Sequence, residues 1–148
     1  EDAYDANAMK NMEVVAQWAN AHPETEFHIF FPPYSILFWD KMERTGATDA
    51  VFSAVETGIG YLIDLCQWDN VHVHFSPDAE EIVTNLDNYG DYIHHSGTVC
   101  TYVLEEIAAG SREITPLTRE NVRGILSSWR EFVVNYDYEA IWAEETAS

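Results

Sequence analysis

Apolar residues recur every three or four positions through most of the chain, a spacing that predicts amphipathic helices. The strongest pattern covers residues 49–68, where one apolar stripe runs from Phe52 to Cys66. Gly58 and Gly60 lower the helix propensity of this segment, and we expect them to permit close packing on a sheet. Further helices are expected at about residues 4–21, 35–46, 96–109 and 118–135.

The ends of these helices are marked by residues with known preferences. Pro23 ends the first helix, with Trp18 expected beside its apolar face, and Gly46 closes the second. Thr118 is the expected N-cap of the last helix. The residues expected to face inward on the last two helices are Val99, Val103, Ile107, Val122, Ile125, Trp129 and Phe132.

Two segments predict β-strands. The run 27–31 is apolar on both faces except at His28, which is typical of a buried parallel strand, and Pro32 ends it. The segment 71–75 alternates, so its valines and phenylalanine share one face while His72 and His74 share the other. Strands that alternate with helices predict an α/β fold with parallel strands.

Two strands cover too little of the apolar surface that the helices present. The chain also begins at Glu1 instead of methionine. We therefore expect residues 1–148 to form one domain that is the C-terminal portion of a larger α/β domain, with further strands in an absent N-terminal half. Residues 143–148 are expected to be a loose tail.

Composition narrows the functional classes. With 47% hydrophobic residues the chain should fold, and its formal charge of −19 argues against binding nucleic acid or an anionic membrane surface. Cys66 and Cys100 lack zinc-like spacing and are expected to be buried free thiols in preference to a disulfide. No apolar run approaches the ~20 residues of a membrane span.

The candidate chemistry lies in "NLDNYGDYIHHS", residues 85–96, which follows the second strand. Open α/β sheets place their sites beyond the carboxyl ends of strands, and this loop presents Asp87, Asp91 and His94 there. The spacing of Asp91 and His94 lets one turn set the carboxylate against Nδ1 of the imidazole. Nε2 would then be free to take a proton from a nucleophile, although such a spacing also arises in ordinary polar loops.

Other polar residues near this edge have simpler interpretations. His72, His74, His94 and His95 could form a metal site, but two histidines on one strand face more often pack under a helix, so we expect no metal. Tyr92 and His95 are expected to pack or to face solvent. The turn 32–35 could border a substrate cleft, although its prolines are explained by strand termination alone.

The order "FHIFFPPYS", helix, "VHVHFS", "NLDNYGDYIHHS", helix resembles the C-terminal half of SGNH (GDSL-type) hydrolases. It is most similar to an uncharacterised SGNH-like group of membrane-anchored cell-envelope proteins in Firmicutes, which carry similar "FFPPYS" and "TNLDNYxDxIH" stretches. The resemblance covers about Ala8 to Trp142, and the loop is its most specific part.

The resemblance implies that Asp91 and His94 are the catalytic aspartate and histidine of a partial SGNH/flavodoxin-like three-layer sandwich. The family's serine and its glycine and asparagine oxyanion donors have no counterpart here, since Asn85 and Asn88 come too late in the order. It implies no cofactor, and a location at the extracellular face of the cytoplasmic membrane or in the cell envelope.

Two functions follow as hypotheses. In the first, the parent protein is a serine esterase or acyltransferase that acts on an acylated cell-envelope carbohydrate or lipid, and this chain alone is inactive. In the alternative, the domain is a non-catalytic cell-envelope interaction module that keeps the fold without the chemistry. In both, exposed strand edges would favour self-association.

Overall fold

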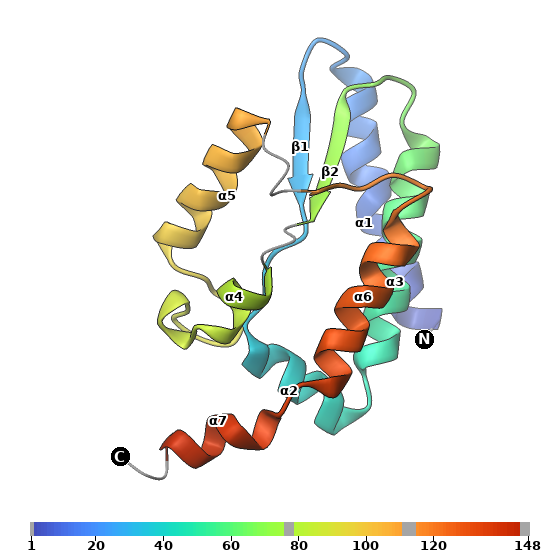
Figure 1. Cartoon of the computed structure of the whole chain (residues 1–148). Coiled ribbons are helices and arrows are strands. Elements are labelled where there is room, and N and C mark those ends of the chain that lie inside the picture. Colours follow the sequence, from blue (N-terminus) through green and yellow to red (C-terminus); the bar gives the residue numbers. More distant parts are fainter. Residues whose placement is uncertain (1, 76–78, 111–114, 146–148) are drawn as a thin grey trace.

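Two parallel strands lie at the centre of a mainly helical α/β chain (Figure 1). The structure is a computed structural model that describes residues 2–75, 79–110 and 115–145. The strands are β1 Phe27–Phe30, β2 Val71–Phe75 and β3 Thr115–Pro116. The helices are α1 Asp2–Ala21, α2 Ile36–Thr45, α3 Thr48–Leu65, α4 Ala79–Thr84, the short 3₁₀ turn η1 Leu86–Asn88, α5 Gly97–Ala109, α6 Val122–Asn135 and α7 Tyr138–Glu145.

The sheet confirms the expected parallel pairing of the first two strands. β1 and β2 are adjacent and parallel, in a register that runs from Phe27 opposite Val71 to Phe30 opposite His74. The short β3 pairs antiparallel with the other side of β2 and was not predicted. In the part of the chain that the structure describes, β1 is therefore an edge strand, and it is only partly buried, so the expectation of a buried strand was wrong for it.

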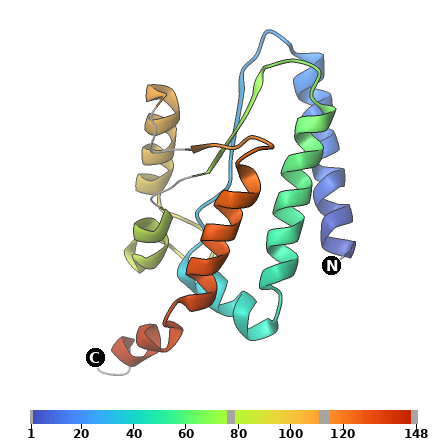
Figure 2. The same cartoon turned by 45° about the vertical axis from the view of Figure 1, so that its right-hand side comes forward.

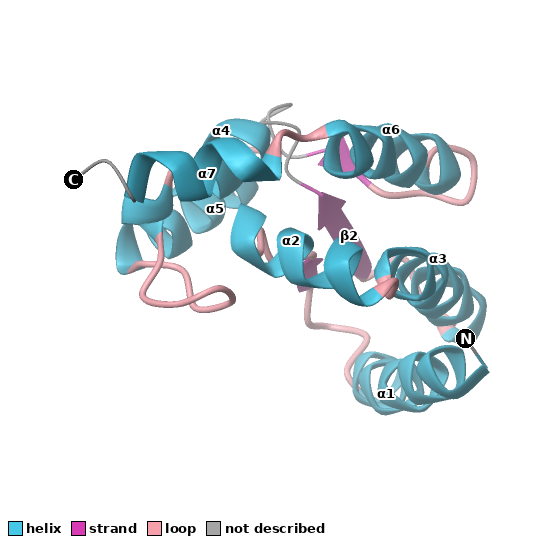
Figure 3. Cartoon of the chain, turned by 90° about the horizontal axis from the view of Figure 1, so that it is seen from below, coloured by secondary structure: helices cyan, strands magenta, loops and turns pink. Residues whose placement is uncertain are grey.

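The two faces of the sheet differ as the alternation of β2 predicts. Val73 and Phe75 lie in the main core with residues of α2, α3 and α6. On the opposite face, Phe30 packs against Val99 and Val103 of α5. Figure 3, which looks along the strands, shows α3 and α6 on one side of β2 and α5 on the other.

Helix α1 packs chiefly on α3, and the two helices lie side by side (Figure 2). A Cβ at Gly58 would lie 3.3 Å from Ala8 Cβ, so the glycine permits close contact between the two helices. The predicted packing of Gly58 and Gly60 on a sheet was therefore wrong, and Gly60 has no atom within 4 Å of such a Cβ. Trp18 is 62% exposed, away from the core face.

Helix ends agree with the sequence in one case and differ in another. Gly46 ends α2 with a positive φ of 67°, as predicted, because glycine has no Cβ to oppose that conformation. The last long helix begins later than expected, at Val122, and Asn121 instead of Thr118 is its N-cap. Thr118 still contributes, since its Oγ1 accepts a hydrogen bond from Asn121 N (3.3 Å).

The C-terminal part of the chain is more helical than the sequence indicates. Leu126 and Val133 are buried in α6, whereas the predicted Ile125 and Phe132 are only partly buried. The expected loose tail was wrong for residues 143–145, which end α7, and residues 146–148 lie outside the described ranges.

Both cysteines are free, as expected, but each is half-buried instead of buried.

Candidate functional site

The loop that holds the predicted aspartate–histidine pair is separated from β2 by α4 and η1, which were not predicted, and it folds back on itself around the pair. Tyr89 and His95 form an isolated antiparallel bridge, and Gly90 N donates to His94 O (2.9 Å). Just beyond the bridge, Ser96 N donates to Asn88 O (2.6 Å) and closes the loop before α5 begins. Local backbone bonds therefore define the positions of the residues between these points.

A single carboxylate organises the turn and holds the imidazole. Asp91 Oδ1 accepts hydrogen bonds from the backbone N–H groups of Ile93 (2.9 Å) and His94 (2.8 Å). Its other oxygen, Oδ2, lies 2.6 Å from His94 Nδ1. The spacing of three residues thus sets the pair together, as the sequence predicts.

Charge and tautomer follow from these contacts. The hydrogen bond from His94, followed by the two backbone donors, lowers the pKa of Asp91 to about 2. Near neutral pH the carboxylate is therefore ionised and can only accept hydrogen bonds, so the proton between the two side chains belongs to Nδ1 of His94. When the imidazole is neutral, Nε2 carries the lone pair, which is the arrangement that a general base requires.

The pair is open to solvent. The His94 side chain is 75% exposed and the Asp91 side chain 46% exposed. Among the described residues, Nε2 of His94 has no hydrogen-bond partner, and no serine or cysteine is paired with it. Within the described residues, the imidazole is therefore oriented by Asp91 and is hydrogen-bonded to no serine or cysteine side chain.

Two long-range hydrogen bonds attach this loop to the turn after β1. Ser35 is fully buried, and its Oγ donates to Tyr92 O (3.0 Å). Tyr89 Oη donates to Pro33 O (2.5 Å), and burial raises the pKa of this tyrosine. The turn 32–35 and the loop 85–96 are thus in direct contact. Sequence reasoning did not identify Ser35 or Tyr89, because both act on partners more than 50 positions away.

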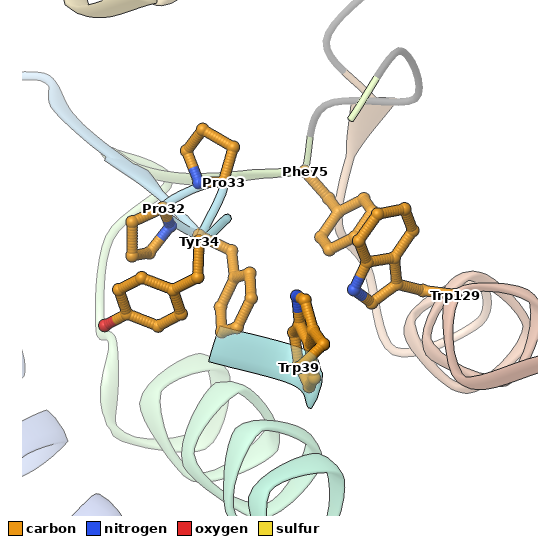
Figure 4. Close-up of a pocket in the computed structure, with 7 residues that line it drawn as sticks. Pro32, Pro33, Tyr34, Trp39, Phe75 and Trp129 are labelled. Atoms are coloured by element: carbon orange, nitrogen blue, oxygen red, sulfur yellow. The ribbon is translucent and has the colours of Figure 1, made fainter. Parts of the chain in front are cut away.

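The proline turn also borders the aromatic core. Figure 4 shows Pro32, Pro33 and Tyr34 on one side of a small cavity that Trp39, Phe75 and Trp129 also line. Its volume is about 10 Å³, which is too small for a substrate group. In this direction the turn packs on the core, and β1 ends at Phe30, shortly before the two prolines, in agreement with their interpretation as strand terminators.

The remaining polar residues of the loop have structural roles. Asn85 Oδ1 accepts from Asp87 N (3.1 Å), and Asn88 Nδ2 donates to Ile82 O (3.1 Å). Asp87 is exposed. His95 contacts the thiol of Cys100, with 3.4 Å between Nδ1 and Sγ. Tyr92 is partly exposed, and the Lys41 ammonium lies 4.8 Å from the centre of its ring.

A second group of histidines lies on the sheet. His28 and His72 stack with ring centres 5.0 Å apart, and His28 Nδ1 lies 3.0 Å from His74 Nε2. His72 Nε2 bonds to Glu26 Oε2 (2.5 Å). Burial, with His28 and His72 nearby, lowers the pKa of His74. No hydrogen bond or ring contact among the described residues joins this group to His94 or His95.

The metal alternative thus involves a different set of residues from the one considered in the sequence. His28 joins His72 and His74 because the register places it opposite His72, a signal that the two strand patterns contained. Within residues 2–75, 79–110 and 115–145, no group of three or more histidine, cysteine or acidic side chains is arranged to hold a metal ion.

No helix in the described part of the chain is both long enough and apolar enough to cross a lipid bilayer. Comparison of the chain with models of protein families, with curated proteins and with solved structures finds no significant match.

Proposed function

We propose that Asp91 and His94 are the orienter and general base of an SGNH-type serine esterase or acyltransferase. The observation that carries this proposal is the 2.6 Å contact between Asp91 Oδ2 and His94 Nδ1, in a loop that is bonded to the turn after the carboxyl end of β1. Open parallel sheets place their sites at this edge. We also propose that the fold is a partial SGNH/flavodoxin-like three-layer sandwich. It is supported by parallel strands that contact α3 on one face and α5 on the other.

The chemistry of the pair fits acyl transfer. His94 Nε2 would accept the proton of a serine hydroxyl as the serine oxygen attacks the ester carbonyl. The leaving alcohol would then take that proton from the imidazolium, and water or an acceptor alcohol would release the acyl group by the same steps. Asp91 stays ionised throughout and stabilises the imidazolium. The serine and the oxyanion donors would come from a part of the protein outside this chain.

The substrate class rests on the resemblance. We propose an acyl ester of a cell-envelope carbohydrate or lipid, handled at the extracellular face of the cytoplasmic membrane or in the cell envelope. The formal charge of −19 opposes nucleic acid as a partner. No step of the proposed reaction requires a cofactor.

Two observations favour the second hypothesis, a non-catalytic interaction module of the cell envelope. Asp91 already accepts two backbone hydrogen bonds, so it would stabilise this turn even if His94 had no chemical role. The 75% exposure of His94 is also what a loop without a catalytic role would show.

An ester panel separates the two hypotheses. The full-length natural protein and the 148-residue chain would be assayed with acetyl, alanyl and longer acyl esters of p-nitrophenol. The enzyme hypothesis predicts turnover by the full-length protein and none by the chain alone, because a base without a nucleophile retains little activity. Inertness of the full-length protein across the panel would favour the interaction module.

A further inference from the structure

A groove of about 680 Å³ opens along the edge of the sheet at β1. It is lined by α1, α2 and α3, by both parallel strands, by the turn after β1 and by Tyr92 and Ile93, and all its lining residues apart from Asn11 and Lys41 are apolar or aromatic. Ile29 and Phe30 both line it, although consecutive side chains of a strand point to opposite faces. Val73 of β2 also lines it, so the groove runs across the core face of the sheet and extends to the edge of β1.

The backbone of β1 has unused hydrogen-bonding capacity on this side. Phe27 N donates to Asn70 O (2.8 Å) and Phe31 N donates to His74 O (3.0 Å), so these residues face β2. Peptide groups alternate along a strand, which directs those of His28 and Phe30 toward the groove. β2 is the one strand paired with β1 among the described residues. An acyl chain could fill the groove but could not satisfy these groups, whereas an extended peptide could do both.

The positive charge of Lys41 indicates which charge an occupant of the groove would carry near it. Four arginines pair with carboxylates of the chain, namely Arg44, Arg119, Arg123 and Arg130. Lys41, which lines the groove beside Tyr92, has no ion-pair partner among the described residues. A carboxylate on the occupant would complement it. A second copy of the chain is disfavoured as the occupant, because each copy carries a formal charge of −19.

We propose that an extended peptide segment adds to the free edge of β1 as a further strand. Its alternate apolar side chains fill the groove, and a carboxylate at its carboxyl end meets Lys41. The segment runs parallel to β1 and so ends beside Tyr92, next to the Asp91–His94 loop. This inference goes beyond the proposed function, because it requires neither the base nor a nucleophile.

The test uses the 148-residue chain and two displayed peptide libraries. One library has ten-residue peptides that are apolar at alternate positions, and the other differs only by a central proline. The first should yield binders and the second none. Upon binding of a selected peptide, hydrogen exchange at the His28 and Phe30 amides should slow at least ~10-fold, because they gain strand partners. The Phe31 amide, already bonded to β2, should change little.

Modified peptides and substitutions in the protein test whether the peptide binds in the groove. N-methylation of the peptide on its pairing side should weaken binding at least ~10-fold without altering the protein. Lys41→Met should weaken peptides with an acidic carboxyl end by about two- to five-fold. Val14→Ser, on the exposed side of α1 outside the groove, is the matched control and should leave binding unchanged.

Three results would overturn the proposal. The first is the absence of binders from the uninterrupted library. The second is that dodecanoate displaces the selected peptide and that this peptide does not slow hydrogen exchange at the His28 amide. The third is a dimer of the chain in which the His28 and Phe30 amides are already protected. None of these measurements involves ester chemistry, so a result that overturns the peptide proposal leaves the esterase hypothesis untouched.

Discussion

Ser35→Ala should loosen the candidate site from the body of the protein. Ser35 is fully buried, and its Oγ donates to Tyr92 O at 3.0 Å. Although it precedes α2, its side chain makes no capping bond, so the substitution removes this one contact and leaves the Tyr92 carbonyl without its donor. Loss of a partner for such a group costs about 1–3 kcal/mol. For a chain of this size, that corresponds to a melting temperature lower by about 2–12 °C.

Urea denaturation gives the loss in the free energy of unfolding, and amide exchange shows where it acts. The Ile93 and His94 amides, both bonded to Asp91, should exchange faster in Ser35→Ala, because the loop loses an anchor. Ser127→Ala, on the exposed side of α6, is the matched control and should change stability by no more than about 0.5 kcal/mol. Equal stability of Ser35→Ala and the unmodified chain would refute the anchoring argument.

Three further predictions concern titrating and buried polar groups. In His94→Ala, carbon NMR should show the pKa of Asp91 rising from about 2 but staying below its ordinary value, since two backbone donors remain; an unchanged pKa would contradict the pairing. Because this pKa is lowered by folding, Asp91 stabilises the folded chain above its unfolded pKa of ~3.9 and loses that contribution as pH falls toward about 2. Folding also lowers the pKa of His74, so stability falls as pH drops below ~6.5. Urea denaturation should therefore show that the free energy of unfolding of His74→Leu rises relative to that of the unmodified chain as the pH falls from 7.5 to 5.5. A difference between the two free energies that stays constant with pH would contradict this prediction. Asn70 is buried, and its Nδ2 donates to three backbone carbonyls. Asn70→Asp should therefore lower the free energy of unfolding by about 2–4 kcal/mol in urea denaturation. A variant of unchanged stability would count against these hydrogen bonds.

Features set by neighbouring residues could be predicted from the sequence. The alternation of β2 fixes which residues face the core, and Gly46 ends α2 for a purely local steric reason. The pairing of Asp91 with His94 belongs to the same class, since both partners lie within one turn. In each case the contact that determines the structure spans only a few positions.

Features set by distant residues could not be predicted. β3 is two residues long and contains Pro116, so it has no periodicity of its own and exists only through its pairing with β2. The apolar run of β1 indicated burial, yet its burial depends on what lies beside the sheet edge. The anchoring of the site by Ser35 and Tyr89 likewise depends on how the turn after β1 meets the loop in three dimensions.

In the proposed function, His94 acts as a general base oriented by Asp91. The most direct test is the kcat/KM of the full-length natural protein for a short-chain p-nitrophenyl ester, with His94→Ala and Asp91→Asn measured in parallel. The claim predicts a loss of about 10³–10⁴-fold or more in each variant, because neither the base nor its orienter can be replaced by the other. Turnover that survives both substitutions at the unmodified rate would contradict it.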